Sequence, residues 1–232
     1  TFFFVFIQPD QAEEFSALVH RRTGDVAPEL TPLLRSRLHA INGLAVTVER
    51  ESEQEDPPDE SRAEKRKNWY VNREYVLTFL DQLPKDNTIV KGAWWKPGQV
   101  VTRPQVSIEE EAAKGLGVDV GTILDLNIQG TILQAEVSSI RKVEWGNFST
   151  NFYMIFSPGS LDGAPMTYVA TVRASPQDEV ALQSAVVATF PNVTAINIGE
   201  VLSSFARVLD RLSLAIRAVA LFCLLAGALV MA

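Results

Sequence analysis

The segment FFFVFIQPDQAEEFSALVHRRTG, residues 2–24, decides the fold that we expect for this chain. Apolar, β-branched and aromatic residues run without a break over Phe2–Ile7, which predicts a buried strand. A helix is predicted over Asp10–Arg22, because apolar residues recur there at helical spacing and acidic residues occupy the first turn. Gly24 ends this helix, and a further strand is predicted over Leu33–Ile41. The N-terminal region is therefore predicted to be β-α-β.

A second β-α-β pattern lies near the other end of the sequence. Strands are predicted over Thr167–Val172 and Val193–Ile198, and a helix over Ser175–Phe190 begins with a Ser-Pro pair and two acidic residues. Two such units at the chain ends favour one α+β lobe, formed from both ends and ferredoxin-like in topology.

The sequence between these two units is rich in short strands. Thr122–Ile128 and Thr131–Val143 alternate around Gln129-Gly130 and predict a hairpin, and Phe152–Phe156 predicts another strand. A short helix is predicted over Val106–Leu116 with Ser107 as its N-cap. We expect this region to form an inserted, β-rich lobe whose sheet curls like a barrel.

The boundaries follow from these patterns and from a charged stretch. Glu49–Lys67 is acidic and then basic, contains a Pro-Pro pair, and is predicted to be a solvated loop. The predicted division is residues 1–70 with 165–200 for the first lobe, 71–164 for the inserted lobe, 199–213 for an amphipathic helix and 214–232 for the start of a membrane span.

The C-terminal sequence LAIRAVALFCLLAGALVMA, residues 214–232, is apolar apart from Arg217. About 20 apolar residues are needed to cross a bilayer core, so we expect the span to continue beyond Ala232. An amphipathic stripe precedes it without an intervening Gly or Pro. One continuous helix over Gly199–Ala232 would be roughly 51 Å long and could carry motion across a membrane surface. The alternative is a docking helix followed by an independent anchor. The residues of this predicted coupling helix are Val201, Leu202, Phe205, Val208, Leu209, Leu212 and Arg217.

Composition and motifs limit the possible functions. A net charge of -7, from 21 basic and 28 acidic residues, argues against a nucleic-acid partner. The single cysteine, Cys223, allows no internal disulfide. GLGVDVG at 115–121 is better explained by helix-ending and turn glycines than by phosphate binding, and His20 and His39 lack the spacing of a metal site. No catalytic residue, cofactor or metal is predicted.

Four aromatic residues, Trp94, Trp95, Trp145 and Phe148, are candidates for lining an apolar ligand groove. Packing in the core is the other explanation for them, and the one that their residue type favours.

The sequence over Val106–Val172 resembles the periplasmic domain of FtsX-like ABC-transporter permeases, and within them the large permeases of the YbbP type. IQPDQ at Ile7–Gln11, LRSRLHAING at Leu34–Gly43, NREYVLTF at Asn72–Phe79 and FPNVTAINIGEVL at Phe190–Leu202 extend the resemblance to nearly the whole chain. The charged loop is longer and more acidic than usual.

This resemblance implies a periplasmic core of two lobes, called Porter and Sabre in the MacB-like relatives, next to a transmembrane helix of a bacterial inner-membrane permease. It implies a separate ABC ATPase subunit and a second permease copy in a homodimer. It also implies a hydrophobic or lipid-like substrate and a periplasmic esterase-like partner protein. It carries over no catalytic residue. Two alternatives stay open: a single-span, membrane-anchored binding module, and a membrane-tethered hydrolase.

Overall fold

A computed structural model describes residues 2–24, 28–46, 62–96, 98, 103–147, 150–175 and 177–200, together with residues 203, 206, 209, 212, 213, 216, 217 and 220. The chain is α+β and rich in sheet, as the sequence predicts. It divides into two compact units, which are described separately below: the first is Thr1–Leu30 with Tyr168–Ala232, and the second is Thr31–Thr167.

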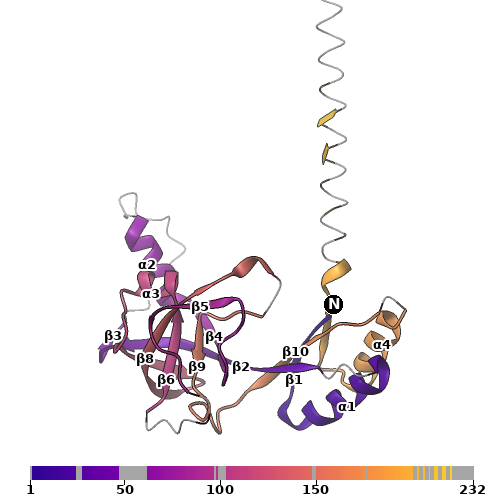
Figure 1. Cartoon of the computed structure of the whole chain (residues 1–232), viewed down its shortest axis with the longest axis horizontal. Helices are drawn as coiled ribbons and strands as arrows, with labels where there is room; N and C mark the ends of the chain where they lie inside the picture. Colours follow the sequence, from indigo (N-terminus) through magenta and orange to yellow (C-terminus); the bar gives the residue numbers. More distant parts are fainter. Residues whose placement is uncertain are drawn as a thin grey trace, which may run out of the picture. The chain divides into compact units, whose positions relative to one another are not determined.

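The first unit combines strands from both ends of the chain (Figure 1). β1 (Phe2–Ile7) is the central strand and pairs antiparallel with β11 (Thr194–Asn197) and with β10 (Thr167–Val172). β2 (Glu29–Ile41) follows β10 in the strand order. The order β11-β1-β10-β2 places β10 between β1 and β2, and β1 between β10 and β11, which is a split β-α-β arrangement.

Two helices of the first unit pack against each other, α1 (Ala12–Thr23) and α4 (Glu179–Thr189), and a short 3-10 turn, η1 (Pro9–Gln11), leads into α1. Their apolar faces and the strands form one core in which Phe15 contacts Phe4 and Phe190, with ring centroids 5.4 and 6.0 Å apart. Each fully buried side chain of this size contributes about 1.5–3 kcal/mol relative to exposure. Burial of these aromatic rings therefore holds the two chain ends together.

The second unit contains a closed ring of six strands. β2 pairs with β4 (Glu74–Phe79), β4 with β9 (Met154–Phe156), and β9 with β6 (Gln105–Glu109). β6 pairs with β8 (Thr131–Val143), β8 with β7 (Ile123–Ile128), and β7 returns to β2. Closure leaves no free edge along this ring.

Shorter elements complete the second unit. β5 (Asn87–Gly92) pairs with the last third of β8, and β3 (Leu44–Ala45) forms a hairpin with the end of β2. The helices α2 (Arg62–Asn72) and α3 (Glu110–Leu116) pack on each other, and η2 (Trp145–Asn147) is a 3-10 turn. The interior is filled by aliphatic and aromatic side chains from all six strands.

Three local predictions were wrong in position. The charged segment is not loop throughout, because α2 begins at Arg62. The start of the predicted helix over Val106–Leu116 is strand β6, and α3 begins only at Glu110. Its N-cap is Glu109, whose carboxylate accepts the backbone N–H of Ala112 at 2.8 Å, while Ser107 is buried in the sheet. A buried five-residue strand resembles the first turn of a short helix in sequence, because both are compact apolar runs.

The hairpins agree with their turn sequences. Ile128 pairs with Thr131 across Gln129-Gly130, and Ile41 pairs with Leu44. The boundary between the units differs from the predicted division at residue 70, since the second unit begins at Thr31. The reason is the length of β2: from Leu34 onward, it pairs with β4 and β7 of the second unit.

Within the described residues, no helix combines the length and the apolar character that a membrane span requires. Most of the predicted span at 214–232, including residues 221–232, lies outside the described residues.

Candidate coupling helix and its joint to the sheet

A helix begins directly at the end of strand β11. The strand ends at Asn197, and residues 198–200 are already helical, so no loop separates the two elements. The Asn197 carboxamide oxygen accepts the backbone N–H of Gly199 at 2.9 Å and that of Glu200 at 3.4 Å. Asn197 is therefore the N-cap of this helix, a role worth about 1 kcal/mol.

The same side chain connects the helix to α4. The Asn197 amide nitrogen donates to the carboxylate of Glu179 at 3.1 Å, and Glu179 is the first residue of α4. One asparagine thus bonds with its oxygen to the emerging helix and with its nitrogen to the helix that packs on the sheet. This geometry fixes the direction of the helix with respect to the first unit.

A second amide contact braces the opposite end of α4. Gln11, at the start of α1, and Asn192, in the turn before β11, exchange two hydrogen bonds of 2.9 Å. Asn192 also donates to the backbone carbonyl of Phe6, at 2.9 Å. The first unit is thereby tied at both ends of α4.

The described residues of the predicted coupling helix are helical and exposed. Leu209 and Leu212 are 65% and 55% exposed, and Ile216, which lies one turn further, is exposed as well. Arg217 is also helical and exposed. An exposed apolar stripe on a helix is typical of a surface that contacts a partner or lipid. The other predicted residues, Val201, Leu202, Phe205 and Val208, lie outside the described residues.

The two residues that form the joint, Asn197 and Glu179, are not among the residues predicted from the sequence. Asn197 and Glu200 have the Asn-x-x-Glu spacing that is close to a capping box, and this signal marks a helix start. Glu179 is one of the two acidic residues at the start of the predicted helix over Ser175–Phe190, and the sequence indicates no other role for it. Its bond to Asn197 depends on the sheet bringing β11 alongside α4, which local sequence does not reveal.

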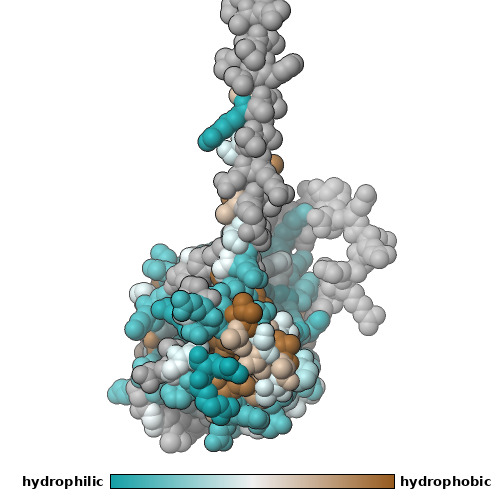
Figure 2. Space-filling model, turned by 90° about the vertical axis from the view of Figure 1, so that its right-hand side faces the viewer, coloured by the Kyte–Doolittle hydropathy of each residue, from teal (hydrophilic) through white to brown (hydrophobic). Residues whose placement is uncertain are grey.

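An uncharged helix face adjoins this joint. No charged residue occurs between Glu179 and Glu200, and Val180 on the outer face of α4 is 74% exposed. The side of the first unit that carries α4 shows an apolar patch surrounded by hydrophilic residues (Figure 2).

In the second unit, Arg141 on β8 is fully buried. Its guanidinium donates to the Asn87 side-chain oxygen at 2.6 Å and to the backbone carbonyl of Phe152. Burial lowers the pKa of Arg141 to about 10, and this shift is opposed by attraction to Glu109 and Asp86. The arginine therefore stays protonated at neutral pH. This network is internal to the second unit, and we assign it to stability.

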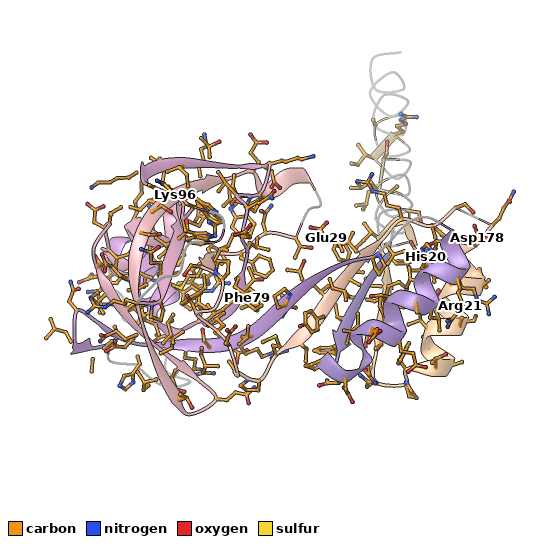
Figure 3. All side chains as sticks on the ribbon, turned by 60° about the horizontal axis from the view of Figure 1, so that its bottom comes forward. His20, Arg21, Glu29, Phe79, Lys96 and Asp178 are labelled. Atoms are coloured by element: carbon orange, nitrogen blue, oxygen red, sulfur yellow. The ribbon has the colours of Figure 1, made fainter. Side chains whose placement is uncertain are left out.

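The sites considered from motifs have structural explanations in the described residues. Gly117 has a left-handed φ of 69° and ends α3. Gly115 lies inside α3 where a Cβ would come within 2.0 Å of the Tyr70 ring, so close packing of α2 and α3 requires glycine. His20 is exposed on α1 (Figure 3) and His39 lies on β2. No group of three or more metal-binding side chains occurs within the described part of the chain.

The predicted aromatic groove is divided into two clusters. Trp94 and Trp95 stack with centroids 3.9 Å apart, and Trp95 packs with Phe152 in a small core cluster. Trp145 instead contacts Tyr153 at 4.9 Å. Phe148 lies outside the described residues.

Comparisons with known proteins give a sequence relative. The chain is 30% identical over 202 residues to the uncharacterized ABC transporter permease YbbP of Escherichia coli strain K12. The match covers 87% of this chain, but the chain spans only 22% of that relative's length. No family model matches the sequence. The sequence is therefore similar to a part of an ABC transporter permease.

A solved structure of a domain described as coming from a permease protein of Porphyromonas gingivalis is a distant neighbour. It is 12% identical, with a TM-score of 0.32, and the match covers 72% of this chain and 74% of that chain.

Proposed function

We propose that this chain is the periplasmic part of an ABC transporter permease of the FtsX-like and MacB-like type, similar to the YbbP permeases. In this role, it couples ATP hydrolysis by a separate cytoplasmic subunit to movement outside the membrane. The 30% identity to a permease supports the transporter component. The direction of transport and a hydrophobic or lipid-like substrate are parts of the proposal.

The observation that carries the coupling mechanism is the joint at Asn197. A strand that continues into a helix without a loop, with its cap bonded to a neighbouring helix, transmits displacement better than a flexible linker does. Motion of the coupling helix would therefore move the first unit as one body.

The proposed setting is the bacterial inner membrane, with the two units in the periplasm and the helix entering lipid after Arg217. The proposed partners are an ABC ATPase subunit, a second permease copy in a homodimer, and an esterase-like periplasmic protein that would act on the substrate. ATP hydrolysis is assigned to the partner subunit and no catalysis to this chain.

The test uses the full-length permease with its ATPase subunit, reconstituted in lipid nanodiscs. Insertion of Gly-Gly-Pro next to Arg211 should break the helix and abolish transport while ATP hydrolysis continues, because proline removes a helical hydrogen bond and clashes with the preceding turn. A matched insertion of Ala-Ala-Ala keeps the helix continuous and should retain a larger share of transport.

Unchanged transport in the Gly-Gly-Pro variant would refute mechanical coupling. Normal binding of periplasmic partners with no dependence on any ATPase would instead favour the membrane-anchored binding module.

A further inference from the structure

Unpaired polar atoms concentrate at Asn72, the last residue of α2, and at Arg73, which connects α2 to β4. Within the described residues, the buried side-chain atoms without a hydrogen-bond partner are Asn72 Oδ1, Arg73 Nε, Arg73 Nη1, Thr78 Oγ1 and Arg141 Nε. Three of these atoms belong to Asn72 and Arg73. Buried polar groups in native proteins nearly always have a partner, which is a protein group, ordered water or a ligand, so this concentration of exceptions marks a place where an additional partner would fit.

The Arg73 guanidinium is held between aromatic rings. Its Cζ atom lies 4.2 Å from the ring centroid of Trp69 and 4.3 Å from that of Tyr153. The ring of Tyr75 is 5.5 Å away. These distances are within the range of cation–π interaction. Stacking holds the guanidinium in place but uses none of its N–H groups, so the buried Nε and Nη1 stay without a hydrogen-bond partner.

The positive charge of Arg73 has no counter-ion among the described residues. Glu74, the next residue, pairs with Arg35 at 3.2 Å, and Glu111 on α3 pairs with Arg66 at 3.2 Å. Nη2 is not among the buried unpaired atoms, so this nitrogen keeps access to solvent. Arg73 thus presents a fixed, unneutralised donor to a ligand from outside.

Two half-exposed indoles belong to the same aromatic group: Trp69 contacts the guanidinium, and Trp145 contacts Tyr153. Trp69 is 53% exposed and Trp145 is 49% exposed. Both contact Tyr153, with centroid distances of 6.4 Å for Trp69 and 4.9 Å for Trp145. Exposed indole faces next to a cation provide apolar contact area for the part of a ligand that carries no charge.

We propose that the aromatic–arginine cluster, formed by Trp69, Arg73, Trp145 and Tyr153, binds an amphipathic anion. The ligand is an oxyanion, a carboxylate or a phosphate monoester, attached to an apolar chain. The guanidinium binds the oxyanion and the two indoles contact the chain. This site goes beyond the proposed transport function and can be tested without ATP, a partner subunit or transport, so its failure would leave the permease proposal untouched.

Isothermal titration calorimetry on the whole chain in nonionic detergent tests the site with four soluble probes: hexyl phosphate, hexanoate, inorganic phosphate and 1-hexanol. The two amphipathic anions should bind saturably and each at least about tenfold more tightly than inorganic phosphate or hexanol, because only they satisfy both the cation and the indoles. Vesicles with and without phosphatidic acid distinguish a lipid headgroup from a free anion as the source.

The variants separate binding from folding. Arg73→Gln should weaken binding of hexyl phosphate by about tenfold or more, and Trp145→Ala by a smaller factor, since it trims only the exposed apolar rim. Arg103→Gln, at an exposed arginine that pairs with Glu136, is the matched control and should not change binding. Circular dichroism checks the fold, and Trp145→Ala keeps the test valid if Arg73→Gln does not fold.

Three results would overturn the proposal: unchanged binding in folded Arg73→Gln, inorganic phosphate or hexanol binding as tightly as hexyl phosphate, or a hexaglutamate peptide binding more tightly than either amphipathic anion.

Discussion

The two units differ in what they bury. Within the described residues, all buried polar and charged side chains belong to the second unit, and the core of the first unit is wholly apolar. In the first unit, Asn197 and Asn192 make their hydrogen bonds at the rim, where the elements begin and end. In the second unit, Arg141 lies inside the closed sheet, bonded to Asn87.

This difference between the cores matches a different role for each unit. In the first unit, an apolar core is sufficient to hold a small, simple sheet together. The hydrogen bonds at the rim of this unit set the direction of the emerging helix. A buried polar network makes a closed sheet depend on one strand register, because a slipped register would leave a charge without partners. Under the proposed function, this difference fits transmission of motion by the first unit and a fixed binding surface on the second.

The largest effect is expected for the buried arginine of the second unit. Arg141→Leu leaves the acceptors Asn87 Oδ1 and Phe152 C=O without a donor, and should destabilise this unit by about 3–5 kcal/mol. Urea unfolding followed by tryptophan fluorescence measures the change, since all four tryptophans lie between Thr31 and Thr167.

The exposed Arg103 is the control for this change. Arg103→Leu should cost less than about 0.5 kcal/mol, because its ion pair with Glu136 is solvent-exposed and long, at 3.8 Å. Equal losses of stability in Arg141→Leu and Arg103→Leu would show that the buried polar network contributes no more to stability than an exposed ion pair.

A smaller effect is expected in the core of the first unit. Leu182 on α4 is fully buried, and Leu182→Ala should cost about 3 kcal/mol through lost contacts and a residual cavity. Because no tryptophan lies in this unit, the loss should appear in circular dichroism while the fluorescence transition stays in place. Val187→Ala on the exposed face of α4 should change neither signal. A shifted fluorescence transition in Leu182→Ala would mean that the units unfold together.

The smallest expected effect is the pH dependence of the stability of the second unit, which arises from buried Tyr75. Burial raises the pKa of Tyr75, and nearby Arg73 opposes the rise. The native state therefore keeps the phenolic proton at pH values where the unfolded chain has lost it. This contribution is complete below about pH 10, the usual pKa of tyrosine, and is lost as the pH rises above it.

Tyr75→Phe tests this dependence. The variant loses the hydrogen bond to the Tyr70 carbonyl, 2.5 Å long, and should be about 1 kcal/mol less stable at pH 7. Its stability should fall less steeply than that of the wild type above pH 10, as measured by urea unfolding between pH 7 and 11. Parallel pH curves for the two proteins would contradict the burial of the Tyr75 hydroxyl.

The sequence was sufficient where the information is local. Apolar runs and turn pairs predicted β1, the hairpin of β7 and β8, and α1, because side-chain periodicity and turn chemistry act over a few residues. The strand β6 was missed: Ser107 resembles a helix cap in sequence, but it bonds to Ser139 at 2.8 Å across a parallel pair. Partners this far apart in the chain leave no local pattern.

The residues of the candidate sites can likewise be predicted from the sequence only where their contacts are local. The cap at Asn197 has a readable signal in its spacing to Glu200, whereas its bond to Glu179 arises only from folding. The burial of Arg141 within an alternating strand, and the meeting of Arg73 with Tyr153, depend on closure of the sheet.

The central claim is that the coupling helix and the first unit move as one body. Double electron–electron resonance between spin labels at Val187→Cys on α4 and Leu209→Cys on the helix measures it directly, in a background in which Cys223 and every other native cysteine of the permease are replaced by Ser. The full-length permease with its ATPase should give one narrow distance distribution that is the same with and without a non-hydrolysable ATP analogue. Asn197→Ala should broaden it, because the two cap bonds to Gly199 and Glu200 and the bond to Glu179 are lost. A broad distribution in the unmodified joint, or a distance that changes with the nucleotide, would contradict the claim.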